Sequence, residues 1–128
     1  MRQIEQDIVA ASRSNTSFHS GTSSSYVPNC NGFRDDLIFE KDNFKYKLWG
    51  NEIATGNTKE KEITVSDCGY ATATTVSRLN AMFAGLDIPM SASVRKGTTV
   101  YRIHGQEVKP GMLHYYAGSW TVTIAQEA

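Results

Sequence analysis

Residues 44–55 read FKYKLWGNEIAT, and this stretch decides the fold. Large apolar residues alternate with lysines from Phe44 to Leu48, the period-two pattern of a strand with one buried face. Trp49 interrupts the polar phase, which predicts that its side chain covers an edge of the core. Gly50-Asn51 favours a tight turn, after which residues 52–55 return as a second strand.

The next residues extend this hairpin and lead into the main helix. A further turn is expected at residues 56–59, followed by a third strand over residues 61–66, so an antiparallel meander is the simplest arrangement. Threonines then precede an amphipathic helix in which Val76, Leu79, Phe83 and Leu86 repeat at helical spacing. Gly85 suits the end of that helix, and Pro89 prevents its continuation.

The remainder of the chain returns to strands. Runs rich in Thr, Val and Tyr predict strands over residues 98–103, 112–116 and 119–124. The sequence therefore predicts an α+β fold: an antiparallel sheet of about five to six strands with one main amphipathic helix and a short N-terminal helix or arm.

The N-terminal region differs in composition from this body. Residues 3–13 place Ile4 and Ile8 at helical spacing, which indicates a short amphipathic helix, an arm that packs on another subunit, or a frayed terminus. Residues 12–25 are dominated by Ser and Thr and read as a loop or linker. We therefore expect an arm and linker over residues 1–25 and a single α+β domain over residues 26–128.

Composition narrows the classes of protein. The 128 residues suit one domain, and 13 Lys and Arg balance 13 Asp and Glu, which argues against a strong general attraction to nucleic acid or anionic membrane. No apolar run reaches the length of a membrane span or a secretory signal, so we expect a cytoplasmic protein. Cys30 and Cys68 lack C-x-x-C spacing and are expected to be free thiols, and no cofactor is indicated.

One candidate site lies where the third strand gives way to the helix. Asp67-Cys68-Gly69-Tyr70 enters the helix through a Thr-rich connection, where backbone amides and hydroxyls can face an anion. Helix capping by the same threonines is the simpler explanation of these residue types. The segment lacks the G-x-x-x-x-G-K-[ST] spacing of a P-loop.

A second candidate is a basic and polar surface that would suit an oligophosphate or nucleotide. The alternative is an ordinary solvated face in which Arg78 pairs with a carboxylate. The predicted ligand-binding residues are Thr74, Thr75, Arg78, Asn80, Arg95 and Arg102, with Lys96 beside them.

The remaining reactive and aromatic side chains favour structural roles. The three histidines, His19, His104 and His114, lack metal-ligand spacing, and a catalytic pairing of Cys68 with His104 has no local signature. The aromatic residues of the later strands are expected to pack in the core and at sheet edges rather than to stack on bases. These aromatics are Tyr101, Tyr115, Tyr116 and Trp120.

Two stretches, LWGNEIA at residues 48–54 and DCGYATATTVSRLNA at residues 67–81, resemble small proteins of tailed bacteriophages that share the pattern W-G-x-x-I-A followed by G-[WY]-x-T-x-T-T-x-x-R-L-N. The resemblance covers about a third of the chain. Tyr70 stands where such proteins often carry tryptophan. The resemblance implies a phage origin and expression in the cytoplasm of a bacterial host, and it supplies no activity.

These observations lead to three functional hypotheses. The first is a non-enzymatic phage accessory protein that binds a host protein or sequesters a nucleotide signal and so blunts a host defence. The second is a regulator that binds nucleic acid, and the third is a virion assembly component. An enzyme is the least favoured class because no nucleophile, base and orienting group are recognisable. Homo-oligomerisation is expected because the apolar N-terminal residues have few local partners.

Overall fold

The computed structural model describes residues 2–21 and 33–125. The expectations for Tyr26, where the body was expected to begin, and for Cys30 lie outside these residues. The described elements, in chain order, are α1 (Gln3–Arg13), β1 (Phe18–Ser20), β2 (Asp35–Glu40), β3 (Asn43–Leu48), β4 (Asn51–Asn57), β5 (Glu62–Val65), α2 (Ala73–Leu86), β6 (Met90–Arg95), β7 (Thr98–Ile103), β8 (Gln106–Val108), β9 (Gly111–Ala117) and β10 (Trp120–Ile124).

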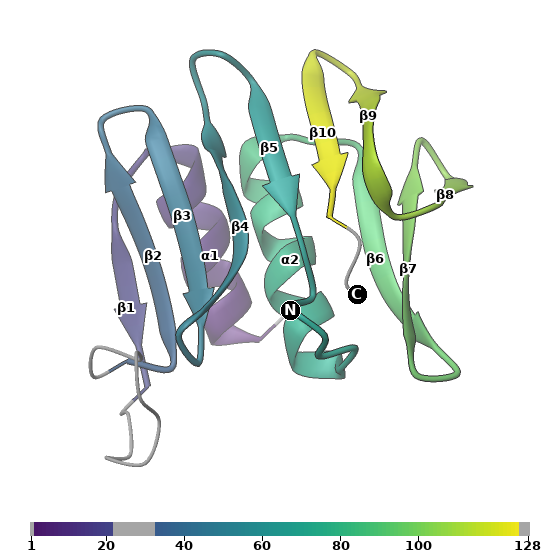
Figure 1. Cartoon of the computed structure of the whole chain (residues 1–128). Coiled ribbons are helices and arrows are strands. Elements are labelled where there is room, and N and C mark those ends of the chain that lie inside the picture. Colours follow the sequence, from purple (N-terminus) through teal and green to yellow (C-terminus); the bar gives the residue numbers. More distant parts are fainter. Residues whose placement is uncertain (1, 22–32, 126–128) are drawn as a thin grey trace.

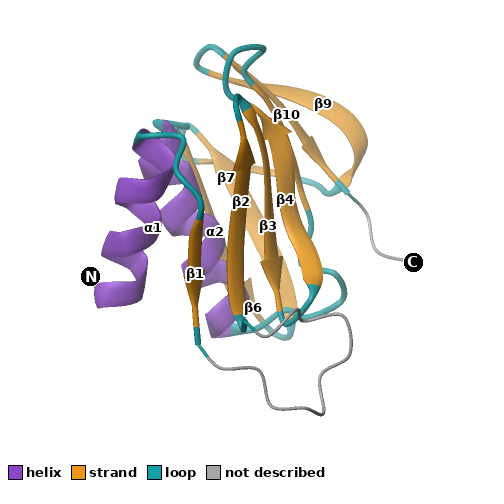
Figure 2. Cartoon of the chain, turned by 90° about the vertical axis from the view of Figure 1, so that its left-hand side faces the viewer, coloured by secondary structure: helices purple, strands orange, loops and turns teal. Residues whose placement is uncertain are grey.

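The strands form a large sheet and a small one. The large sheet has seven strands in the order β1-β2-β3-β4-β5-β10-β9, and the small sheet has the order β6-β7-β8. Every described pairing is antiparallel except that of β10 with β5, which is parallel. Both helices lie against the same face of the large sheet (Figures 1 and 2). The α+β prediction is confirmed, with more strands than the sequence indicated.

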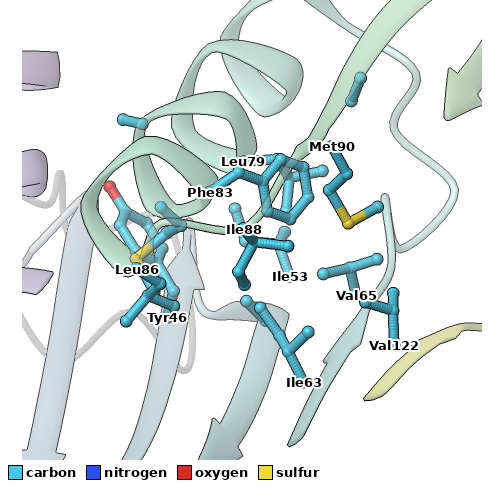
Figure 3. Close-up of a cluster of buried hydrophobic side chains, with 14 of the residues drawn as sticks. Tyr46, Ile53, Ile63, Val65, Leu79, Phe83, Leu86, Ile88, Met90 and Val122 are labelled. Atoms are coloured by element: carbon cyan, nitrogen blue, oxygen red, sulfur yellow. The ribbon is translucent and has the colours of Figure 1, made fainter. Parts of the chain in front are cut away.

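The core lies between α2 and the large sheet. Leu79 and Phe83 of α2 are almost completely buried, and they face Ile53, Val65 and other apolar residues of the strands (Figure 3). The expected alternation in β3 is confirmed, because Phe44, Tyr46 and Leu48 are all buried. The predicted period-two strand and period-3.6 helix thus form the two layers of the core.

Two strands that the sequence did not predict have residues of low strand propensity. Strand β2 begins with two aspartates, Asp35 and Asp36, which are nonetheless buried because both carboxylates have cationic or hydrogen-bonding partners. Strand β6 begins Met-Ser-Ala-Ser, and it buries Met90 and Ala92 against the body. Tertiary contacts therefore outweigh local preference in both strands.

The turn expected at residues 56–59 begins later, because β4 continues through Asn57. Gly56 pairs with Phe44 on one side and Ile63 on the other. A Cβ atom at Gly56 would lie 2.7 Å from Cζ of Phe44 and would collide with the Glu62 carbonyl oxygen. The glycine is needed for close strand packing and does not mark the turn.

Residues 2–21, which fall in the region where an arm and linker were expected over residues 1–25, pack on the rest of the described chain. Helix α1 packs along α2, with Ile8 fully buried and Ser12 Oγ 3.3 Å from Met82 Sδ. Gly85, expected as a helix cap, lies inside α2, where a Cβ would approach the Ser12 Cβ to 2.6 Å. Asp87 takes the left-handed cap conformation instead, with φ of 58°.

The Ser- and Thr-rich residues that follow α1 also contribute to the sheet. The backbone N–H of Phe39 donates to Ser17 Oγ at 2.9 Å, and β1 then pairs with β2. Hydroxyl hydrogen bonds to the neighbouring strand explain how a polar segment joins the fold. The apolar residues of α1 have partners within the chain, so the reason given above for oligomerisation no longer holds.

A buried ionic cluster, which we call the Asp35 cluster, joins α2 to the large sheet. The Asp35 side chain is fully buried and accepts hydrogen bonds from Arg78 Nε at 2.7 Å, Tyr46 Oη at 2.6 Å and Arg34 Nε at 2.6 Å. The Arg78 side chain is only 4% exposed. Three donors therefore compensate the cost of burying one carboxylate. Their hydrogen bonds link β2, β3 and α2.

This cluster fixes the protonation of its members. Burial disfavours the charged form of Asp35, but the hydrogen bonds from Arg78, Tyr46 and Arg34 together outweigh burial and lower its pKa. Burial and the neighbouring Asp35 carboxylate raise the pKa of Tyr46, so its hydroxyl remains a hydrogen-bond donor. Asp35 is therefore an anion that is stable only with its partners in place.

We predict that Arg78→Met lowers the free energy of unfolding by about 3–5 kcal/mol, because it removes the buried one of the two cations that pair with the Asp35 carboxylate and leaves only the more exposed Arg34. The matched control is Arg95→Met, which removes an exposed arginine that is 3.2 Å from Glu107 and should cost about 1 kcal/mol or less. Urea unfolding followed by circular dichroism measures both losses. Equal, small losses for the two variants would contradict a structural role for Arg78.

The lowered pKa of Asp35 predicts a pH dependence of stability. The ionised Asp35 carboxylate contributes to the free energy of unfolding. This contribution is complete above about pH 3.9, the usual aspartate pKa, and is lost as the pH falls through the lower pKa that Asp35 has in the folded state. The stability of the unmodified chain should therefore fall more steeply in this acid range than that of Asp35→Asn. Parallel curves for the two proteins would show that Asp35 is not the titrating group.

Candidate functional site

The two phage-like sequence stretches meet at a cavity of about 420 Å³ beside the β3–β4 turn and the start of α2. Figure 1 shows this turn and the first turn of α2 at the same end of the large sheet. We call the cavity the aromatic hollow. Its lining comes from Leu48, Trp49, Asn51, Ile53, Asp67, Tyr70, Thr72, Thr74 and Thr75.

Two exposed aromatic side chains line the hollow. Trp49 is 43% exposed and Tyr70 is 57% exposed. Trp49 and Gly50 both have positive φ, 53° and 79°, as in the turns that close two-residue hairpins. The Trp49 N–H donates to the Arg34 carbonyl at 2.8 Å, which holds the turn against β2. The turn thus presents a large apolar side chain to solvent at a fixed place.

The start of α2 forms the polar side of the hollow. Thr72 is the N-cap, and its Oγ1 accepts the Thr75 N–H at 3.2 Å. Its hydroxyl also lies 3.1 Å from that of Thr75. Helix amides and threonine hydroxyls at this end can meet electronegative atoms of a ligand.

The acidic member of the lining is already engaged. Asp67 accepts the Gly69 N–H at 2.9 Å with one carboxylate oxygen and the Thr99 hydroxyl at 2.7 Å with the other. Neither lysine nor arginine is among the lining residues, all of which the structure describes. The lining therefore combines aromatic surface, hydroxyls and one carboxylate, which suits binding of a polar planar molecule more than acid–base chemistry.

The six residues predicted to bind a ligand do not form one surface. Thr74 and Thr75 line the aromatic hollow. Arg78 is buried in the Asp35 cluster, and Asn80 donates to the Ala92 carbonyl at 2.8 Å while accepting the Ala92 N–H at 2.7 Å. Arg78 and Asn80 thus join α2 to β2 and β6 through internal hydrogen bonds, and neither lines the aromatic hollow.

Arg95 and Arg102 lie on the small sheet, and the register places both on one face with Ser93 and Glu107. Arg95 Nη2 is 3.2 Å from Glu107 Oε1, and Arg102 Nη1 donates to Ser93 Oγ at 3.3 Å. The opposite face carries Ala92, which contacts α2 through Asn80. Neither arginine therefore shares a site with Thr74 and Thr75.

The sequence did not identify Trp49 and Tyr70 as site residues. The position of Trp49 out of phase with the strand alternation predicted that its side chain covers an edge of the core, whereas the side chain is 43% exposed and lines the hollow. The phage-like pattern contained both aromatics, but only the fold shows that its two parts meet.

The other candidate side chains have separate partners. His19 Nδ1 lies 2.6 Å from Asp36 Oδ1, and His104 Nε2 accepts the Gly118 N–H at 3.3 Å. The Cys68 Sγ donates to the Glu52 carbonyl at 3.1 Å. The structural role of Tyr101 and Trp120 is confirmed by their burial. Within residues 2–21 and 33–125, no three His, Cys, Asp or Glu side chains converge as metal ligands would.

Neither described helix has the length and apolar character needed to cross a membrane.

Comparison with known proteins gives the family. No curated protein and no solved structure matches the chain. The family model described as the Kyanoviridae Gp96 protein matches residues 1–122. The chain therefore belongs to the Kyanoviridae Gp96 family of phage proteins.

Proposed function

We propose that this protein is a non-enzymatic phage accessory protein that binds a small nucleoside or nucleotide stoichiometrically in the aromatic hollow. The observation that carries the proposal is the convergence of Trp49 and Tyr70 on one cavity at the start of α2. A volume of about 420 Å³ lies within the usual range of small-molecule sites, about 300–1,000 Å³.

The aromatic side chains support recognition of a flat heterocycle. Exposed tryptophan and tyrosine rings stack on nucleobases, and each such contact stabilises binding by about 1–3 kcal/mol. Leu48 and Ile53 supply apolar surface in the same lining. A nucleobase would therefore bury its faces without needing a charged partner.

The polar residues of the hollow support the sugar and phosphate part of the ligand. The amides and hydroxyls at the start of α2 suit a phosphate. The Asp67 carboxylate accepts one hydrogen bond at each oxygen within the chain, and its remaining acceptor capacity suits ribose hydroxyls or a base amino group. With no lysine or arginine among the lining residues, a ligand of low negative charge is favoured over an oligophosphate. This ligand class differs from the oligophosphate that the arginines suggested.

Stoichiometric capture is a role consistent with this lining. It offers recognition groups and lacks a nucleophile with a general base beside it. In the host cytoplasm, such a protein would lower the free concentration of a nucleotide signal and so act against a defence that depends on it. Capture would require the protein in amounts comparable to those of the ligand.

The charge distribution favours a small ligand over a nucleic acid. The 13 Lys and Arg are balanced by 13 Asp and Glu, and five of the basic side chains are within ion-pair distance of carboxylates in the same chain, so no strong general positive field would attract a nucleic acid. These pairs are Arg2–Glu5, Arg34–Asp35, Lys45–Glu52, Arg78–Asp35 and Arg95–Glu107.

We predict that isothermal titration with adenosine, cyclic adenosine monophosphate and ADP-ribose gives heat for at least one of these probes. For that probe, Trp49→Ala and Tyr70→Ala should each weaken binding by about 5- to 150-fold, the equivalent of one lost stacking contact. The bound probe should also change the fluorescence of Trp49, which is exposed, whereas Trp120 is buried.

The matched control is Tyr116→Ala, which removes a more exposed aromatic residue that does not line the hollow, and it should leave affinity unchanged. Absence of heat from all three probes would contradict the proposal that this protein captures a nucleotide. Equal weakening by Tyr116→Ala would show that binding occurs elsewhere.

A further inference from the structure

One edge of the large sheet ends in a long strand that pairs on one side only. Strand β9 has seven residues, Gly111–Ala117, and β10 is its single pairing partner within residues 2–21 and 33–125. The opposite edge, β1, has three residues. Proteins usually protect such edges by shortening them or by adding charge, so the length of β9 is unusual.

The outward backbone groups of β9 follow from its hairpin with β10. Ala117 pairs with Trp120 across the two-residue turn at Gly118 and Ser119, and such a turn places their N–H and C=O groups toward each other. The direction of the backbone N–H and C=O groups alternates from residue to residue along an antiparallel strand. The N–H and C=O groups of His114 and Tyr116 therefore point away from β10. Four strong hydrogen-bonding groups thus face outward along this edge.

The side chains of β9 make this edge suitable for association. Leu113 is 65% exposed and Tyr116 is 77% exposed, the two largest values among the exposed large apolar residues described. The sequence GMLHYYA contains no Asp, Glu, Lys or Arg. A strand without formal charge can approach an identical strand without like-charge repulsion.

We infer that β9 pairs with β9 of a second copy of this chain, antiparallel and about a two-fold axis at Tyr115. In this register His114 of each copy lies opposite Tyr116 of its partner, and the outward N–H and C=O groups of all four residues are satisfied. Tyr116 then packs beside the imidazole of the other copy. The two large sheets become continuous, with seven strands from each copy.

The other strand edges of the chain are less suitable partners. Strands β1 and β8 have three residues each, too few to match β9, and the backbone N–H and C=O of Ala92 on the six-residue edge strand β6 are already bonded to the Asn80 side chain. Pairing of β9 with any different edge would be head-to-tail and would leave a free β9 on the next copy, so it would build an open filament or a ring of several copies. Pairing of β9 with itself closes after two copies.

Sedimentation equilibrium tests this pairing through the mass of the particle. The unmodified chain should have twice the 14.2 kDa mass of one copy. His114→Pro should yield one-copy particles, because proline removes an outward N–H and spares the bonds between β9 and β10. Tyr116→Lys should have the same effect by placing a charge on the edge.

The control is Thr64→Lys, which adds the same charge to an exposed position of β5 in the middle of the sheet and should leave the two-copy mass. Circular dichroism verifies that each variant is folded, and Tyr116→Lys decides the question if the proline variant unfolds. A one-copy mass for the unmodified chain, or a two-copy mass in both edge variants, would overturn the inference. Nucleotide binding is measured separately and does not enter this test.

Discussion

The burial of the Asp35 carboxylate is the constraint on which the rest of this structure depends. A buried anion is tolerated only with several donors, and here they come from Tyr46, Arg34 and Arg78. Because the donors belong to different elements, satisfying one charge fixes α2 against the strands β2 and β3. Apolar packing between Leu79 and the sheet supplies contact area, whereas the ionic cluster supplies one particular placement.

The aromatic hollow is built directly on this cluster. Asp35 pairs in register with Leu48, and the backbone of Arg34 accepts the hydrogen bond that holds Trp49. On the helix, Arg78 lies one turn beyond Thr75, which lines the cavity. The arginine expected to contact a ligand thus joins the helix that carries Thr75 to the strands β2 and β3. Its place in the phage-like pattern is explained by architecture rather than by recognition.

The sequence predicted those parts of the fold in which local preference and burial agree. Strand β3 and helix α2 have clear periods, and both were found where expected. Strand β2 was missed because two aspartates have poor strand propensity, and their compensation comes from residues distant in the sequence, Arg78 and His19. Of the residues that line the candidate site, the sequence predicted Thr74 and Thr75. It did not predict Trp49 and Tyr70, because they come from two segments that only the fold brings together.

A double-mutant cycle between Asp35 and Arg78 tests the central claim most directly. The free energy of unfolding would be measured for Asp35→Asn, Arg78→Met and the double variant. If the pair fixes the helix on the sheet, the double variant should lose less stability than the sum of the two single losses, with a coupling of about 2 kcal/mol or more. Additive losses, agreeing within about 0.5 kcal/mol, would contradict the account.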